Sequence, residues 1–349
     1  MEQRSFGLTK EGKQVTEYTL TNANGMEMSV IDLGATITSV KTKGADGKVY
    51  DVVLGYDNPV DYQNNTCYFG AAIGRNSNRI NQARINLDGE EFTLEANDNE
   101  NNLHSGSNGF HAVIWDVEKA DTQSITFSYV SKDGEQDFPG NMTVKITYTL
   151  TDENEVAIAY DAVSDKTTVA NLTNHSYFNL DGHASGSIEE QELEIRASYY
   201  TPVIDGKAIP TGDIEKVSGT PMDFRKMKKI GTDIGADFVQ LTYVGGYDHN
   251  YVLDKADGTM QLAARAKAVN SGICMDVYTD CVGVQLYAGN FVGEHAGKGG
   301  VTYGFRHGFC LETQYFPNAI NEKNFKAPVL RPGENYHSET KYCFGIAEA

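Results

Sequence analysis

Cysteine is scarce and unpatterned in this chain of 349 residues. The cysteines are odd in number, five, and no two of them form a Cys-x-x-Cys pair. This usage indicates neither a disulfide framework nor a zinc knuckle. Free and mostly buried thiols are therefore expected at Cys67, Cys274, Cys281, Cys310 and Cys343.

Positive charge is also in short supply. Lys and Arg total 29 against 48 Asp and Glu, which gives a formal net charge of −19. An anionic chain is repelled by phosphate backbones and by acidic membrane surfaces, so neither nucleic acid nor membrane is expected as a partner. The same charge favours a neutral sugar over a sugar phosphate, and no basic cluster accompanies the motifs described below, apart from Arg75 and Arg79.

Long apolar runs are missing as well. No run approaches the length of a membrane-spanning helix, and the polar start Met1–Ser5 is not a secretory signal. The cytoplasm is the expected location, with a periplasmic or secreted protein left open if a signal has been removed. Monomer and homodimer are equally compatible with the sequence.

Helical periodicity is rare, and the dominant period is two. The best helical candidate, 224–238, contains Gly231 and Gly235, so only short helical turns are expected there. Apolar and polar residues alternate along Met142–Leu150, as in a strand with one buried face. Similar patterns predict strands at 27–33, 36–42, 50–55, 84–94, 124–130, 155–163, 192–197, 260–267, 273–279, 284–288, 309–315 and 339–346.

Turn signals separate these strands, and there is no internal repeat or linker. Pairs such as Asn24-Gly25 and Asp133-Gly134 favour tight reversals. The pattern predicts an all-β protein, one large antiparallel β-sandwich domain over residues 1–349 with a few short helices. In such a sandwich, residues far apart in sequence meet in space.

Two segments contain residues suited to proton transfer on a sugar. His175 lies between amides and aromatics in Asn174–Leu180, and Glu312 lies in Gly308–Gln314. Histidine exchanges protons near neutral pH, aromatics suit the apolar faces of a sugar ring, and amides suit its hydroxyls. A histidine and a carboxylate that converge on one sugar can move a proton on and off neighbouring oxygens.

An ordered series of blocks extends this pattern along the chain. In these blocks the sequence resembles the aldose 1-epimerase (galactose mutarotase) family nearly from end to end. The resemblance implies the galactose mutarotase-like supersandwich fold and cofactor-free interconversion of the α and β anomers of a free aldohexose such as galactose or glucose. The blocks are Gly70–Ile80, Asn102–Gly106 with Gly109, Phe110 and Trp115, Asn174–Leu180, Gly246–Tyr251, Gly283–Phe291, Gly308–Gln314 and Leu330–Tyr336.

The resemblance implies a catalytic pair. His175 would be the acid that donates to the ring oxygen O5, and Glu312 the base that accepts the proton of the C1 hydroxyl. The ring then opens to the aldehyde, C1 rotates, and closure on the other face exchanges the roles. An acid is required because breaking the C1–O5 bond leaves charge on O5. Strand alternation places Glu312 on one face with Cys310 and Gln314.

The same resemblance implies the residues that bind the sugar. Arg75, His249 and Trp115 are expected to be structural. Ser77 and Ser105 stand where the family commonly has alanine and glycine, which are minor departures. The expected sugar-binding residues are Asn78, Arg79, His104, Tyr177, Asp248 and Gln285.

Four other interpretations compete with this one. A catalytic metal is disfavoured because no His-x-x-x-His or Cys-x-x-Cys spacing occurs. A glycosidase would use two carboxylates, for which Asp248 and Glu312 are the available pair. A non-catalytic sugar-binding sandwich would be expected to lack the His175 and Glu312 pair. A sugar-6-phosphate 1-epimerase is disfavoured by the acidity of the chain.

Overall fold

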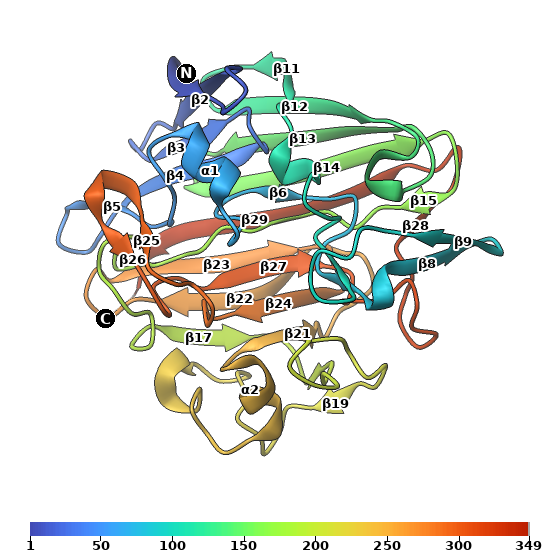
Figure 1. The fold of residues 1–349 in the computed structure, drawn as a ribbon. Helices are drawn as coiled ribbons and strands as arrows, with labels where there is room; N and C mark the ends of the chain where they lie inside the picture. The colour runs from blue at the N-terminus through green and yellow to red at the C-terminus, as the bar shows by residue number, and fades with distance from the viewer. Residues whose placement is uncertain (348–349) are drawn as a thin grey trace.

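The computed structural model describes residues 1–347, and strands dominate it (Figure 1). The largest sheet has nine strands in the order β11-β12-β13-β14-β29-β23-β22-β17-β20, all antiparallel. Its strands are β11 (Asp116–Ala120), β12 (Ser124–Ser131), β13 (Met142–Leu150), β14 (Glu155–Ser164), β29 (Tyr336–Ile346), β23 (Ile273–Thr279), β22 (Gln261–Lys267), β17 (Glu192–Ile195) and β20 (Lys228–Lys229).

Two five-stranded antiparallel sheets accompany it. The N-terminal sheet contains β1 (Glu2–Leu8), β2 (Gln14–Thr21), β3 (Glu27–Ile31), β4 (Thr36–Lys43) and β5 (Val49–Asp51) in chain order. The second of these sheets has the order β19 (Glu215–Lys216), β18 (Tyr199–Tyr200), β21 (Asp248–Val252), β24 (Gly283–Tyr287) and β27 (Cys310–Gln314).

Short strand pairs and helical turns connect these sheets. The pairs are β7 (Arg79–Ile80) with β10 (Asn102–Leu103), β6 (Ala72–Ile73) with β16 (Thr173–Asn174), β8 (Arg84–Leu87) with β9 (Glu90–Thr93), β15 (Thr168–Val169) with β28 (Val329–Leu330), and β25 (His295–Ala296) with β26 (Thr302–Tyr303). The helices are α1 (Pro59–Asn64) and α2 (Val239–Val244), with 3-10 turns η1 (Asn81–Ala83), η2 (Phe110–Ala112), η3 (Glu135–Asp137), η4 (Ile230–Thr232) and η5 (Lys298–Gly300).

Both five-stranded sheets cover the same face of the nine-stranded sheet. Tyr148, Ile158 and Thr340 are cross-strand partners, so their side chains point to one face. The Tyr148 hydroxyl donates to the Ala35 carbonyl beside β4 at 2.6 Å, and Thr340 hydrogen-bonds Thr313 of β27. The buried residues between these layers form one large apolar core. The predicted antiparallel β-sandwich is therefore confirmed.

The alternating pattern of β13 is borne out by its burial. Every second residue of Met142–Leu150 is buried and the residues between them are exposed or half-buried. The predicted strand 273–279 is present with both ends as predicted, and the other predicted strands are present with ends shifted by a few residues. The predicted strand 84–94 is a hairpin, β8 and β9, because Asp88-Gly89 forms its turn with both residues at positive φ. The predicted strand 50–55 ends at Asp51.

The expectation of only short helical turns within 224–238 is confirmed. Only η4 falls within this segment, and α2 begins after it, at Val239. The amides of Ile230 and Gly231 donate to the carbonyls of Gln191 and Glu189, so tertiary hydrogen bonds replace helical ones. A Cβ at position 231 would lie 2.9 Å from the Glu189 carbonyl oxygen, which explains glycine there. No helix within residues 1–347 is long and apolar enough to cross a membrane.

Candidate active site

A cavity of about 270 Å³ opens where β27 and β21 meet the loops around β7, β10 and β16. It is lined by both predicted catalytic residues and by all the predicted sugar-binding residues except Gln285. Gln285 lies beside the cavity, paired in register with Glu312 and hydrogen-bonded to Asp248 at 2.7 Å. The full lining is Thr66, Cys67, Tyr68, Asn78, Arg79, Leu103, His104, His175, Tyr177, Asp248, Tyr287, Phe291 and Glu312.

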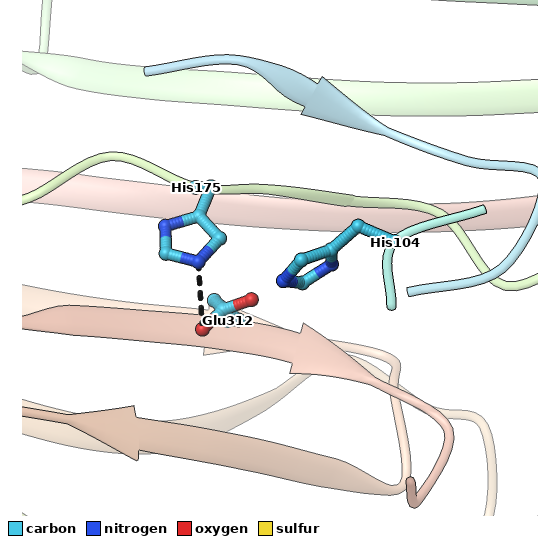
Figure 2. A group of neighbouring side chains, drawn as sticks. All are labelled: His104, His175 and Glu312. Carbon is cyan, nitrogen blue, oxygen red and sulfur yellow. Dashed lines mark ion pairs between the residues drawn. The ribbon is translucent and has the colours of Figure 1, made fainter. Parts of the chain in front are cut away.

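His175 and Glu312 face each other across this cavity (Figure 2). Nε2 of His175 lies 3.6 Å from Oε1 of Glu312, and both side chains are almost fully buried. Burial raises the pKa of Glu312 well above its ordinary 4.5, and the Asp248 carboxylate adds to that rise. Burial lowers the pKa of His175 to about 4. The surroundings therefore favour an uncharged pair, in which the one shared proton is on Glu312 and the His175 imidazole is neutral.

The backbone and two neighbours fix the position of His175. Its amide donates to the Ala71 carbonyl at 2.9 Å, and its carbonyl accepts from Gly70 at 3.0 Å. Tyr177 stacks on the imidazole with ring centroids 5.1 Å apart. Sγ of Cys310 lies 3.5 Å from Nδ1. With Nδ1 occupied, Nε2 is the nitrogen directed at Glu312.

His104 presents a proton to the cavity. Its Nδ1 accepts the backbone N–H of Asn78 at 3.1 Å, so the proton of the neutral ring is on Nε2. Burial and the neighbouring His175 hold the pKa of His104 well below its ordinary value, so the ring is uncharged at neutral pH. Its centroid lies 5.2 Å from that of His175. His104 is therefore a neutral hydrogen-bond donor beside the catalytic pair.

The tautomer of His104 also decides whether this residue could bind a metal ion. Ligand atoms of His104, His175 and Glu312 lie within 4.8 Å of one another, a set that matches known zinc ligands in type. A metal-bound imidazole turns its unprotonated nitrogen to the ion and donates from the other nitrogen. In His104 the unprotonated nitrogen is already engaged by the Asn78 amide, so this arrangement does not fit a metal ligand.

Arg79 and Asp248 form the opposite wall. Nε of Arg79 donates to Oδ2 of Asp98 at 2.8 Å, and its Nη1 lies 3.9 Å from Oδ2 of Asp248. Asp248 also accepts from Gln285, and burial raises its pKa while Arg79 opposes that rise. The two ladders β21·β24 and β24·β27 bring Asp248, Gln285 and Glu312 onto neighbouring strands.

Three residues predicted to be structural lie away from the cavity. The five N–H groups of the buried Arg75 guanidinium are shared among six acceptors, four backbone carbonyls and the hydroxyls of Ser131 and Thr168. His249 is buried behind Asp248, and burial lowers its pKa to about 3. Trp115 is buried, and its indole N–H donates to the Phe110 carbonyl.

Sequence reasoning missed several residues of the site. Asp98 holds Arg79, but in sequence it looks like a solvated loop residue between two asparagines. The ring of Tyr68 lies against the rings of His104 and His175, but nothing in the sequence around Tyr68 marks it as a site residue. Its positive φ of 58° is visible only in the structure. Cys310 was placed on the Glu312 face, but its contact with His175 appears only in three dimensions.

Comparison with known proteins identifies the family of the chain. The model of one family, described as aldose 1-epimerase, matches residues 16–343. The chain is 40% identical over 343 residues to galactose mutarotase from Sus scrofa, with 98% of each chain covered. It is 38% identical to aldose 1-epimerase from Escherichia coli K12 over the same coverage. The chain belongs to the aldose 1-epimerase family.

Solved structures extend the match to the fold of this aldose 1-epimerase family member. Galactose 1-epimerase from Lactobacillus acidophilus has a TM-score of 0.85 and 29% identity, covering 99% of both chains. An aldose epimerase homologue from C. elegans has a TM-score of 0.88 and 29% identity, covering 95% of this chain and 99% of that one. The predicted family, fold and isomerase class are thus confirmed.

Proposed function

We propose that this aldose 1-epimerase interconverts the α and β anomers of a free aldohexose, galactose or glucose, with His175 as acid and Glu312 as base. The observation that carries this proposal is the 3.6 Å approach of Nε2 to Oε1 inside a cavity of about 270 Å³. Two proton-transfer groups so close can serve O1 and O5, which are bonded to the same carbon.

The protonation state of the pair changes as the sugar ring opens. In the ring-closed complex, Glu312 must be a carboxylate and His175 an imidazolium. When the ring opens, Glu312 has gained the O1 proton and His175 has given its own to O5, so both become neutral. Burial favours that neutral pair, as the raised pKa of Glu312 and the lowered pKa of His175 indicate. The one proton of the pair must therefore pass from Glu312 to His175 before the ring opens, a transfer that burial opposes and that the positive charge of Arg79 near Glu312 favours.

The surrounding polar groups are proposed to hold the sugar. Arg79 and Asp248 bind ring hydroxyls, with Gln285 supporting Asp248 and Asn78 supporting His104. The Nε2–H of His104 donates to O5 or to a neighbouring hydroxyl. Tyr177 supports the His175 ring and closes the apolar side of the cavity. A buried carboxylate facing hydroxyl donors selects sugars that carry them.

Broader assignments accompany this function. A free aldose is proposed as the substrate, with neither nucleic acid nor membrane as partner. Free sugar is preferred over its 6-phosphate because the chain carries a net charge of −19. Five unbridged thiols support a cytoplasmic location. The shared core supports one domain over residues 1–349, as a monomer or homodimer.

Polarimetry of freshly dissolved α-galactose and α-glucose tests the proposal. The protein is expected to accelerate the change in rotation without added metal or nucleotide, and to keep its rate in the presence of a chelator. Activity that is abolished by the chelator and restored by a divalent ion would instead favour metal binding by His104, His175 and Glu312. A faster rate with glucose 6-phosphate than with glucose would overturn the assigned preference.

A further inference from the structure

One strand, β27, contacts both nitrogens of the His175 ring. Nε2 lies 3.6 Å from Oε1 of Glu312, and Nδ1 lies 3.5 Å from Sγ of Cys310. Cys310 and Glu312 are two positions apart on β27, so their side chains stand on the same face about 7 Å apart along the strand. Tyr177 covers one face of the imidazole, with the two ring planes 24° from parallel. A flip of the ring would put carbon atoms at both contacts, so the present orientation is the one that keeps them.

The proposed function requires that Nε2 of His175 can receive a proton. The resting pair holds its one proton on Glu312, and that proton must pass to His175 before the sugar ring opens. A neutral imidazole carries an N–H on one nitrogen and a lone pair on the other. Only the tautomer with its proton on Nδ1 directs the lone pair of Nε2 at Glu312. A ring with its proton on Nε2 would face the carboxylic acid with an N–H and could not accept from it.

A buried N–H at Nδ1 needs an acceptor, and the side chain that offers one is Cys310. Its Sγ lies within the distance of a hydrogen bond to sulfur, and both residues are almost fully buried. An N–H without a partner is costly in such surroundings. Burial lowers the pKa of His175 to about 4, and a hydrogen bond with its own backbone opposes that change. The contacts around Nδ1 therefore favour the tautomer that the reaction needs.

The sulfur of Cys310 stays uncharged. Burial raises the pKa of this thiol well above its ordinary value, and the carboxylates of Glu312 and Asp248 add to that rise. A carboxylate in the place of Cys310 would stabilise the imidazolium of His175 and make it a weaker acid. A neutral thiol is a weak acceptor. It therefore orients the ring and leaves the imidazolium acidic enough to protonate O5, a weakly basic ether oxygen.

We infer that Cys310 is a positioning residue of this epimerase. Its sulfur accepts the Nδ1–H of His175, fixes the tautomer in which Nε2 can take the proton of Glu312, and adds no charge that would weaken the acid. The inference rests on the proposed function, because the task of Cys310 exists only if His175 protonates O5. The thiol forms no bond to the sugar and exchanges no proton with it.

Nitrogen NMR of wild-type protein with isotope-labelled histidines shows the tautomer directly. The chemical shift of each ring nitrogen depends strongly on whether that nitrogen carries a proton, and the signals of His175 are those missing from His175→Asn. At neutral pH, Nδ1 of His175 is expected to be protonated and Nε2 to be unprotonated. A ring protonated on Nε2 would overturn the inference, because the thiol would then be the donor. This measurement needs no variant of Cys310.

Two substitutions of Cys310 separate the acceptor from the packing of the side chain. Cys310→Ala removes the acceptor and should lower kcat by about tenfold, the effect of losing one neutral hydrogen bond. KM should change little, because positioning acts on proton transfer and not on sugar binding. Cys310→Ser keeps an acceptor and should recover most of kcat. Full activity of Cys310→Ala, or equal losses in the two variants, would refute the positioning role.

Cys274→Ala is the matched control. Cys274 is a half-buried thiol on β23 of the nine-stranded sheet, and its removal should change neither kcat nor the tautomer of His175. Inactivity of the wild type toward every aldose would refute the proposed function and the role of Cys310 with it. An active enzyme with His175 protonated on Nε2 would refute the role of Cys310 alone.

Discussion

Replacing Glu312 with glutamine removes the proposed proton acceptor and preserves the shape of the side chain. Oε1 lies 3.6 Å from the His175 imidazole, and Oε2 is buried without a hydrogen-bond partner within residues 1–347. That free oxygen is available to the C1 hydroxyl. General-base catalysis contributes roughly 10² to 10⁴ in rate, so kcat of Glu312→Gln should fall by at least a hundredfold. Sugar affinity should change little, because the proton moves only in the transition state.

The same substitution should make the protein more stable. Burial raises the folded-state pKa of Glu312 above its ordinary value, so the unfolded chain ionises at a lower pH than the native one. As pH rises from the unfolded pKa to the raised folded pKa, the native state is progressively destabilised, by about 1.4 kcal/mol for each pH unit between the two values. Glutamine has no charge to bury. At neutral pH, Tm of Glu312→Gln should exceed that of the wild type.

Three measurements separate the roles of this carboxylate. Polarimetry gives kcat and KM, calorimetry gives sugar affinity, and thermal unfolding gives Tm. Glu91→Gln is the control, because Glu91 is an exposed carboxylate on β9 and should leave all three unchanged. Near-normal turnover of Glu312→Gln would refute the base assignment and make Asp248 the candidate acceptor. A lower Tm would show that the carboxylate stabilises the fold.

Three further predictions concern the same site. His175→Asn should also lower kcat by roughly a hundredfold or more. In the double variant with Glu312→Gln, the loss of kcat should be smaller than the two single losses combined, because acid and base serve one proton exchange. Losses that add up fully would argue against a coupled pair. Asp98→Asn should raise KM by roughly tenfold with a smaller change in kcat, because Asp98 positions Arg79 through a charged hydrogen bond. A KM that recovers in Asp98→Glu would show that the carboxylate positions Arg79, whereas a KM that stays high would indicate that substitution at this position disturbs the fold. The pH profile of kcat/KM should be flat while the pair holds one proton. It should fall below about pH 4, where His175 also becomes protonated, and fall again above the raised pKa of Glu312, where the pair loses its last proton. An acid limb near the ordinary histidine pKa would contradict the lowered pKa of His175.

Much of the site could be predicted because its residues lie in recognisable blocks. Asn78, Arg79, His104, His175, Asp248 and Glu312 all line one cavity, as the resemblance implied. Their roles in catalysis and binding remain predictions. Asp98 and Tyr68 escaped notice, and the contact of Cys310 with His175 was not predicted, because each matters through a contact with another side chain, which neither composition nor spacing reveals.

The sequence by itself determined the fold class. Period-two alternation, as in Met142–Leu150, and Gly-containing turns such as Asp88-Gly89 act locally, so they can be read along the chain. Where the local sequence pattern was weak, tertiary contacts decided the secondary structure. They limited the helical turn within 224–238 to η4 by drawing 228–232 into contact with 189–193, through hydrogen bonds between segments nearly forty residues apart.

Tertiary structure also decided the chemical states of the site. The sequence supplied a histidine and a glutamate, but burial of both side chains at a separation of 3.6 Å set their opposite pKa shifts. The tautomer of His104 follows from one backbone amide, that of Asn78. Desolvation and hydrogen-bond direction depend on every neighbour of a group. Those neighbours are assembled only when the sheets pack.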